Sequence, residues 1–173
     1  MTYDYLIVGG GIVGISTAWQ LIQRYPDKQI MVVEKESHFA EHQTGHNSGV
    51  IHAGVYYQPG SLKADFCRRG NEATIKFCQK HDIPYEQCGK LLVATDELEY
   101  QRMIALEERC RENRIEVERL SETDLRIMEP HIVGVGALLV RSTAITDFTA
   151  ITQTLLELFK KSNGTVLMEA EVT

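Results

Sequence analysis

The sequence predicts an α/β fold in which a Rossmann-like parallel sheet is interleaved with the start of an α+β domain. A glycine-rich turn, residues 9–14, separates a short apolar strand from an amphipathic helix, and a second apolar strand follows. This order of elements is typical of a nucleotide-binding βαβ unit. Strand-like residues return at 165–173, after a long stretch with a different pattern, and this predicts that the first domain is completed late in the chain.

Each element of the βαβ unit has its own signal. Tyr3–Val8 is short, aromatic and β-branched, which favours a buried strand. Ile15–Tyr25 carries apolar residues at helical spacing, and Pro26 ends that helix. Gln29–Glu34 is again apolar. A strand, a helix and a strand of these lengths form a right-handed crossover, so we expect the two strands to be parallel.

The glycines and one acidic residue predict a dinucleotide site. Gly9 allows the tight turn, Gly11 lets the backbone approach a pyrophosphate, and Gly14 lets the helix pack closely on the strand. The N-terminus of the helix then offers N–H groups to the phosphates. Glu34 lies 20 residues after Gly14, where its carboxylate can accept hydrogen bonds from ribose hydroxyls. The same charge would repel a 2′-phosphate, which disfavours NADP.

NAD-binding and FAD-binding domains share this motif, and the segment 37–60 distinguishes between them. An NAD domain normally passes from its second strand to another helix within a few residues. Here a long glycine-rich segment follows, with too many Ile, Val, Tyr and His residues for a disordered linker. Its hydroxyls, amide and glycines are suited to wrap a long polar ligand.

The rest of the chain predicts further helices and strands. Helices are expected at 62–79, at 97–113 with Asp96 as N-cap, from Ser121 to Pro130, and after Asp147, with Gly164 near the last C-cap; strands are expected at 90–95, 135–141, 165–168 and 171–173. We therefore assign residues 1–80 and 144–173 to the nucleotide-binding domain and residues 82–143 to the first part of a substrate-binding domain.

Composition narrows the classes of function. The chain has 173 residues and a formal net charge of −6, without a basic patch, which excludes nucleic acid as an expected partner. No apolar run approaches the roughly 18–20 residues of a membrane-spanning helix, and the first residues lack a basic signal region. We expect a cytoplasmic protein. The four cysteines match neither metal nor disulfide spacings, so we expect reduced thiols and no metal site.

Three motifs together resemble one superfamily. The glycine turn 9–14, the segment Val32–Lys35 and the run Gln43–Tyr57 are similar to the FAD-dependent D-amino-acid oxidase/glycerol-3-phosphate dehydrogenase superfamily. Within it, the run 46–63 and the segment Cys88–Leu91 most closely resemble the L-2-hydroxyglutarate oxidase (dehydrogenase) family. The resemblance implies an FAD cofactor and transfer of hydride from a CH–OH or CH–NH bond to flavin N5.

The closer resemblance also implies the substrate and the size of the protein. The expected reaction converts L-2-hydroxyglutarate, a small 2-hydroxy acid, into 2-oxoglutarate. The family has roughly twice as many residues, so the chain is expected to be an N-terminal fragment that is inactive alone and binds FAD weakly. Either oxygen or a quinone would accept the electrons. A quinone would imply peripheral association with the inner face of the cell membrane.

Site residues follow from the resemblance at matching positions only. It places Gly9, Gly11 and Gly14 at the FAD pyrophosphate, Glu34 at the adenosine ribose, Thr44, Asn47, Ser48 and Gly49 along the pyrophosphate and ribityl chain, Ile51, His52 and Gly54 near the isoalloxazine, and the backbone of Val172 at the adenine.

The catalytic residues are less well defined by the sequence. Oxidation of a hydroxy acid needs a base for the hydroxyl proton and cations for the carboxylates. His52 is the candidate base, because imidazole exchanges protons near neutral pH; a histidine that only positions the flavin or the backbone is the alternative. Tyr56, Tyr57 and Lys63 are candidates for binding a substrate carboxylate, although Lys63 could equally be a solvated helix residue.

Two other functions stay open at this point. A superfamily relative could act on glycerol 3-phosphate or an amino acid instead. A flavin-binding module without a reaction of its own would carry the same cofactor motifs.

Overall fold

The computed structural model describes residues 2–173, which form two compact units. One unit contains the described residues up to Gly49 together with Asp147–Thr173, and the other is Val50–Thr146. Residues 50–80 therefore belong to the second compact unit. The predicted domain boundaries follow from the order of the expected helices and strands, and they stay a prediction. Among residues 2–173, no helix is long and apolar enough to cross a membrane.

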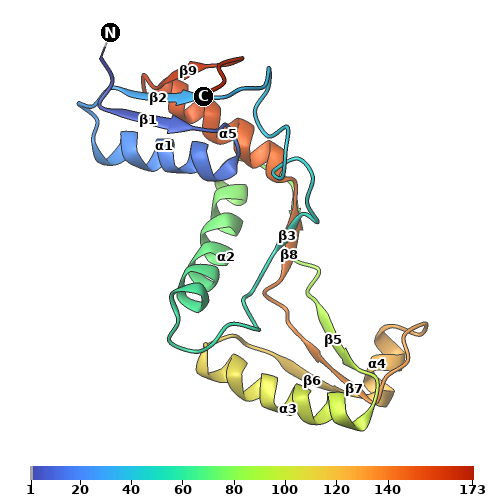
Figure 1. The fold of residues 1–173 in the computed structure, drawn as a ribbon. Helices are drawn as coiled ribbons and strands as arrows, with labels where there is room; N and C mark the ends of the chain where they lie inside the picture. Colours follow the sequence, from blue (N-terminus) through green and yellow to red (C-terminus); the bar gives the residue numbers. More distant parts are fainter. Residues whose placement is uncertain (1) are drawn as a thin grey trace. The chain divides into compact units, whose positions relative to one another are not determined.

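The first unit contains a parallel three-stranded sheet. Strands β1 (Tyr5–Val8) and β9 (Thr165–Leu167) flank the central strand β2 (Ile30–Val33), and both pairings are parallel. Helix α1 (Ile12–Arg24) connects β1 to β2, and helix α5 (Phe148–Lys161) precedes β9. This confirms the predicted βαβ unit and its completion by a strand from the end of the chain (Figure 1).

Helices α1 and α5 pack side by side and form the core of this unit with the sheet (Figure 1). Ile15 and Ala18 of α1 and Phe159 of α5 are fully buried. Asp147 caps α5, since its carboxylate accepts a hydrogen bond from the backbone N–H of Thr149 at 2.7 Å. The amphipathic pattern read from the sequence thus corresponds to real buried faces.

The strand predicted at 171–173 is wrong. These residues form no strand, and β9 ends at Leu167. Glu169 adopts a φ of 54°, which turns the chain out of an extended path. The backbone N–H groups of Glu169 and Ala170 instead donate to the carbonyl oxygens of Glu36 and Glu34, at 3.1 and 2.9 Å. The segment is therefore fastened beside the end of β2 by two hydrogen bonds.

The second unit contains a small antiparallel sheet and the longest helix. Strands β3 (Val50–Ile51) and β4 (Tyr85–Glu86) both pair with β8 (Ala144–Thr146). Helix α2 (Leu62–Lys80) lies between β3 and β4 in sequence, close to its predicted bounds. The sequence does not predict these three strands, because two or three residues are too short to show alternation.

A second antiparallel sheet completes this unit. Strands β5 (Leu91–Ala94) and β6 (Glu118–Ser121) flank β7 (Gly136–Leu139). Helices α3 (Glu97–Glu112) and α4 (Glu122–Met128) pack on this sheet. Both begin at predicted N-caps, Asp96 and Ser121, and Ser121 forms a full capping box with Asp124.

Candidate functional site

The glycine turn brings α1 directly against the end of β1. Gly9 has a φ of 105°, a conformation that favours glycine, and its N–H donates to the Val33 carbonyl oxygen at 2.8 Å. A methyl group built on Gly14 would overlap the Gly9 carbonyl oxygen. One built on Gly9 would meet nothing within 4 Å, so the space over this residue is open. The turn is therefore closed on the helix side and open on the side where a ligand would approach.

The N-terminus of α1 faces this open side without a charged cap. Gly11 is its N-cap residue and makes no side-chain hydrogen bond, and the first turn contains no acidic residue. The backbone N–H of Ile12 donates to Thr44 Oγ1 at 3.0 Å. A helix start of this kind keeps its partial positive charge available for an anion.

Glu34 lies at the end of β2 with its carboxylate held by backbone donors. Its Oε2 accepts a hydrogen bond from Gly10 N at 2.5 Å, and its Oε1 accepts one from Glu36 N at 2.9 Å. The residue is only 9% exposed. Burial raises the pKa of the Glu34 carboxyl, but the backbone N–H groups of Glu36 and Gly10 outweigh this and hold its pKa below the ordinary value. The carboxylate is thus ionised at neutral pH.

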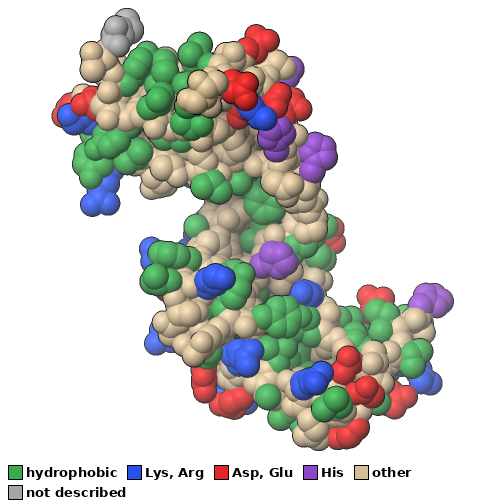
Figure 2. All heavy atoms as spheres, in the orientation of Figure 1, with side chains coloured by type: hydrophobic (Ala, Val, Ile, Leu, Met, Phe, Trp, Pro, Cys, Tyr) green, Lys and Arg blue, Asp and Glu red, His purple; other side chains and the backbone are tan. Residues whose placement is uncertain are grey.

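These groups line a cavity of about 210 Å³. Its walls are Gly9, Gly11, Glu34 and the loop residues 40–44. Figure 2 shows histidine and acidic side chains gathered over the segment that follows β2, where His42 pairs with Glu36 at 2.9 Å. Open glycine backbone and a helix N-terminus suit phosphates, and a buried carboxylate acceptor suits ribose hydroxyls, so this cavity, which we call the glycine-turn cavity, fits a dinucleotide.

The loop residues predicted to follow the ligand are not all in this cavity. Thr44 lines it, whereas the Asn47 amide folds onto its own loop. Asn47 Nδ2 donates to the Thr44 carbonyl oxygen at 2.6 Å, and Asn47 Oδ1 accepts from Gly49 N at 2.7 Å. Ser48 is exposed beside it. Asn47 therefore shapes the loop, and ligand contacts of residues 47–49 stay a prediction.

A second cavity, of about 160 Å³, gathers most of the predicted catalytic and substrate residues. It is lined by residues 52–57 together with Lys90 and Thr143, and we call it the His52 cavity. His52, Tyr56 and Tyr57 were predicted from the sequence. Lys90 and Thr143 were missed. Lys90 had a signal, because it is a charged residue at the start of a predicted apolar strand; Thr143 had none.

A buried amide fixes the backbone of the His52 cavity. Asn71 of α2 is 7% exposed. Its Nδ2 donates to the carbonyl oxygens of Ile51 and His52, each at 3.3 Å, and to that of Ser142 at 2.9 Å. At the C-cap of α3, Asn113 Nδ2 donates to the Tyr57 carbonyl oxygen at 2.8 Å. One side chain of α2 and one at the C-cap of α3 thus hold the segment that carries His52.

Two predicted residues lie elsewhere. Lys63 is exposed in the first turn of α2 and is not among the residues that line the His52 cavity. Val172 is 56% exposed, beyond the end of β9. The structure therefore brings neither residue to a described cavity, and their roles at substrate and adenine stay predictions.

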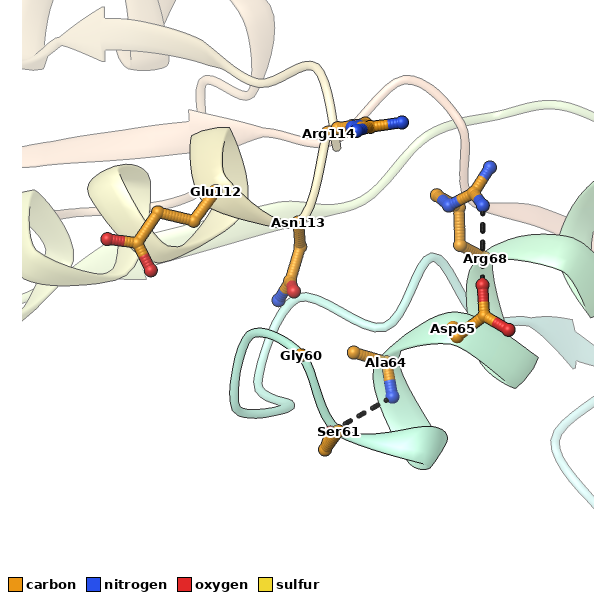
Figure 3. A pocket seen from close by; sticks show the side chains of 8 residues that line it. All are labelled: Gly60, Ser61, Ala64, Asp65, Arg68, Glu112, Asn113 and Arg114. Atoms are coloured by element: carbon orange, nitrogen blue, oxygen red, sulfur yellow. Dashed lines mark hydrogen bonds and ion pairs between the residues drawn. The ribbon is translucent and has the colours of Figure 1, made fainter.

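Figure 3 shows a third cavity, of about 280 Å³, near the start of α2. Its lining balances two acidic side chains, Asp65 and Glu112, against two basic ones, Arg68 and Arg114. Arg68 is already paired with Asp65 at 3.4 Å, and Ser61 Oγ accepts from Ala64 N at 3.2 Å as the helix cap (Figure 3). These pairings account for Asp65, Arg68 and Ser61, and the two remaining charges, those of Glu112 and Arg114, are opposite in sign.

The fold and the glycine-turn cavity define a class of flavoenzyme. The family described as FAD dependent oxidoreductase (DAO) matches residues 4–173, and the chain belongs to this family. FAD is the cofactor of the family, and its members are oxidoreductases. The chain is 53% identical over 171 residues to L-2-hydroxyglutarate dehydrogenase of Escherichia coli (strain K12), covering 99% of this chain and 40% of that protein. It is 43% identical to the mitochondrial L-2-hydroxyglutarate dehydrogenase of Homo sapiens, over 99% of this chain and 37% of that protein.

Solved structures support the fold. An L-α-glycerophosphate oxidase from Mycoplasma pneumoniae, with FAD bound, matches with a TM-score of 0.91 and 27% identity over 100% of this chain and 46% of the oxidase. An L-proline dehydrogenase from P. horikoshii matches with a TM-score of 0.87 at 18% identity, over 99% of this chain and 45% of that chain. The chain therefore spans less than half the length of the relatives it matches.

Proposed function

We propose that the full-length protein oxidises the CH–OH group of L-2-hydroxyglutarate to give 2-oxoglutarate. The observation that carries the proposal is the 53–54% identity to bacterial L-2-hydroxyglutarate dehydrogenases over 99% of the chain. That similarity extends over the residues of both the glycine-turn cavity and the His52 cavity. The gathering of His52, Tyr56 and Tyr57 in one cavity gives it independent chemical support.

The residues present fit FAD. Glycines 9, 11 and 14 and the N-terminus of α1 would hold the pyrophosphate, and Glu34 the adenosine ribose. The other residues proposed to contact the cofactor are Thr44, Asn47, Ser48, Gly49, Ile51, Gly54 and the backbone of Val172. When bound, FAD supplies the acceptor for the hydride at its N5 atom.

His52 would accept the proton from the substrate hydroxyl. Its ring is exposed, and its residue lines the His52 cavity with two tyrosines. Its backbone carbonyl is fixed by Asn71, so the position of the ring depends mainly on its own side-chain torsions. An imidazole that can exchange protons near neutral pH is suited to this task.

The substrate is tested by anaerobic bleaching of the full-length, FAD-loaded protein. L-2-hydroxyglutarate should reduce the flavin in a stopped-flow measurement faster than glycerol 3-phosphate or a panel of amino acids. Faster reduction by either of the others would transfer the proposal to that substrate. No bleaching by any of them would favour a flavin-binding module without a reaction of its own.

His52→Ala should retain FAD but lose most turnover, because general base catalysis typically contributes about 10²–10⁴-fold. Turnover, flavin content and the pH–rate profile should be measured together. His131→Ala, an exposed histidine between α4 and β7, is the matched control. Activity of His52→Ala within a few-fold of wild type would contradict the assignment as base and leave a positioning role.

The electron acceptor is proposed to be oxygen or a quinone. A quinone would require peripheral association of the full-length protein with the inner face of the cell membrane. Comparing reoxidation of the reduced protein by oxygen and by a soluble quinone analogue, with and without lipid vesicles, separates these two acceptors.

A further inference from the structure

The His52 cavity is lined by one lysine, Lys90. No acidic residue lines the cavity. Lys90 is half-buried, and its Nζ lies 5.2 Å from the centre of the Tyr56 ring. Within residues 2–173, no carboxylate forms an ion pair with this ammonium group. In a chain with a net charge of −6, a lysine without a carboxylate partner in a cavity makes this place locally suited to an anion.

Thr143 is a second, independent indication of a polar ligand. It lines the same cavity and is only 4% exposed. Over the described part of the chain, its hydroxyl makes no hydrogen bond, in contrast to the Asn71 amide, which has three carbonyl partners. Among the described residues, the fully buried side-chain oxygen without a partner is that of the neighbouring Ser142, so the Thr143 hydroxyl, which also has no partner, keeps some accessible surface. The hydroxyl is therefore available to a ligand in the cavity.

Lys90 and Thr143 are held in place by backbone hydrogen bonds. Lys90 N donates to the Val140 carbonyl oxygen at 3.1 Å, and Val140 N donates back to the Lys90 carbonyl oxygen at 2.8 Å. Gly89 N donates to the Thr143 carbonyl oxygen at 3.0 Å. A cation and a hydroxyl donor are thus fixed on adjoining segments that both face His52, Tyr56 and Tyr57 in the cavity.

We propose that Lys90 and Thr143 bind a carboxylate of the substrate, and that the site accepts 2-hydroxy dicarboxylates for this reason. Lys90 supplies the opposite charge, and Thr143 donates a hydrogen bond to one carboxylate oxygen. The inference rests on the proposed function for the identity of the substrate. The claim that this cavity binds a carboxylate rests only on Lys90 and Thr143. In this proposal the cation at the substrate carboxylate is Lys90 and not Lys63, the lysine expected from the sequence.

The test measures binding and turnover in the full-length, FAD-loaded protein. Isothermal titration with 2-oxoglutarate should give a Kd at least tenfold higher for Lys90→Gln than for wild type, with partial recovery in Lys90→Arg. The KM for L-2-hydroxyglutarate should rise by a similar factor while kcat changes by less than about threefold. Thr143→Val should raise the Kd by about three- to tenfold, as expected for the loss of one hydrogen bond.

Two lysine variants sharpen the comparison. Lys80→Gln, at the exposed end of α2, is the charge-matched control and should leave the Kd unchanged. Lys63→Gln tests the alternative cation directly. A weaker Kd in Lys63→Gln together with an unchanged Kd in Lys90→Gln would overturn the proposal, and so would unchanged Kd values in both Lys90→Gln and Thr143→Val.

A monocarboxylate distinguishes which end of the substrate is bound. If Lys90 binds the side-chain carboxylate, Lys90→Gln should weaken the binding of 2-oxoglutarate but not that of 2-oxobutyrate. If Lys90 binds the carboxylate beside the reacting carbon, the binding of both compounds should weaken. Either result supports the carboxylate site. Wild-type protein that binds 2-oxoglutarate through Lys90 but does not oxidise L-2-hydroxyglutarate would refute the proposed function and leave this inference standing.

Discussion

Glu34 shows how one residue can link the stability of the fold to the dinucleotide site. Its carboxylate accepts the Gly10 and Glu36 N–H groups, so it ties the glycine turn to the end of β2. The pKa of Glu34 is lowered in the folded protein. The stability that follows is fully present above the unfolded-state pKa of about 4.3 and is lost as pH falls through the lower folded-state pKa.

We therefore expect Glu34→Gln to lower the free energy of unfolding at pH 7 by about 1–3 kcal/mol, because one backbone N–H then faces an amide donor. The difference from wild type should shrink below about pH 4, where the wild-type carboxylate becomes protonated. Urea unfolding of the FAD-free protein between pH 3 and 8 measures this difference in free energy of unfolding. The pH range is chosen to include the ordinary carboxyl pKa. Asp27→Asn, in an exposed turn after α1, is the matched control. A penalty that is constant over this pH range would contradict the role of the charge.

Single residues differ in how far the sequence predicts them. Glu34 and Gly14 follow from spacing alone, because the βαβ unit is local and its geometry is general. Lys90 and Thr143 are far apart in sequence and meet only through pairing around β5 and β7, which spacing does not encode. Asn71 was missed for a similar reason, since its three carbonyl partners come from two distant segments.

Two helical glycines offer a test at the scale of elements, because the same substitution should have opposite effects. A methyl group at Gly14 would overlap the Gly9 carbonyl oxygen and push α1 away from the turn. One at Gly70, inside α2, would meet no heavy atom within 4 Å. We expect Gly14→Ala to lower the free energy of unfolding by about 1–3 kcal/mol or more and to reduce FAD content. We expect Gly70→Ala to raise it by about 0.5–1 kcal/mol.

Thermal or urea unfolding of both variants, with flavin content after dialysis, gives the comparison. Gly70→Ala should keep the flavin content of wild type, because its methyl group points into open space. A Gly14→Ala variant that is as stable and as rich in flavin as wild type would show that α1 does not need its close approach to β1.

Elements with a chemical start signal were predicted well. Asp96, Ser121 and Asp147 each cap the helix expected after them. The two-residue strands β3 and β4 were missed because they carry no periodicity and exist only through pairing with β8. The strand expected at 171–173 has suitable residues, but the left-handed backbone of Glu169 redirects the chain before it. Local chemistry thus predicts helix ends better than it predicts short strands.

At the scale of the whole molecule, the chain enters and leaves the second unit once. It passes from the first unit at Gly49–Val50 and returns at Thr146–Asp147. The domains predicted from the sequence, residues 1–80 with 144–173 and residues 82–143, stay a prediction beside this division. Helical periodicity predicts helix α2 but does not reveal which elements it contacts.

The residues proposed to contact FAD occur in both units, so the proposed contacts can be tested over the entire chain. A ligand at a concentration 100-fold above its Kd stabilises the state that binds it by about 2.7 kcal/mol, or roughly 100-fold in local opening. Hydrogen exchange of the full-length protein, with and without FAD, should therefore slow most at residues 9–14, 40–49 and 51–54. Helices α3 and α4, which carry no proposed contact, should change much less. Slower hydrogen exchange confined to residues 9–14 and 40–49 would refute the proposed contacts of Ile51 and Gly54. Equal slowing of exchange in α3 would show that FAD stabilises the chain as one cooperative body instead of through these residues.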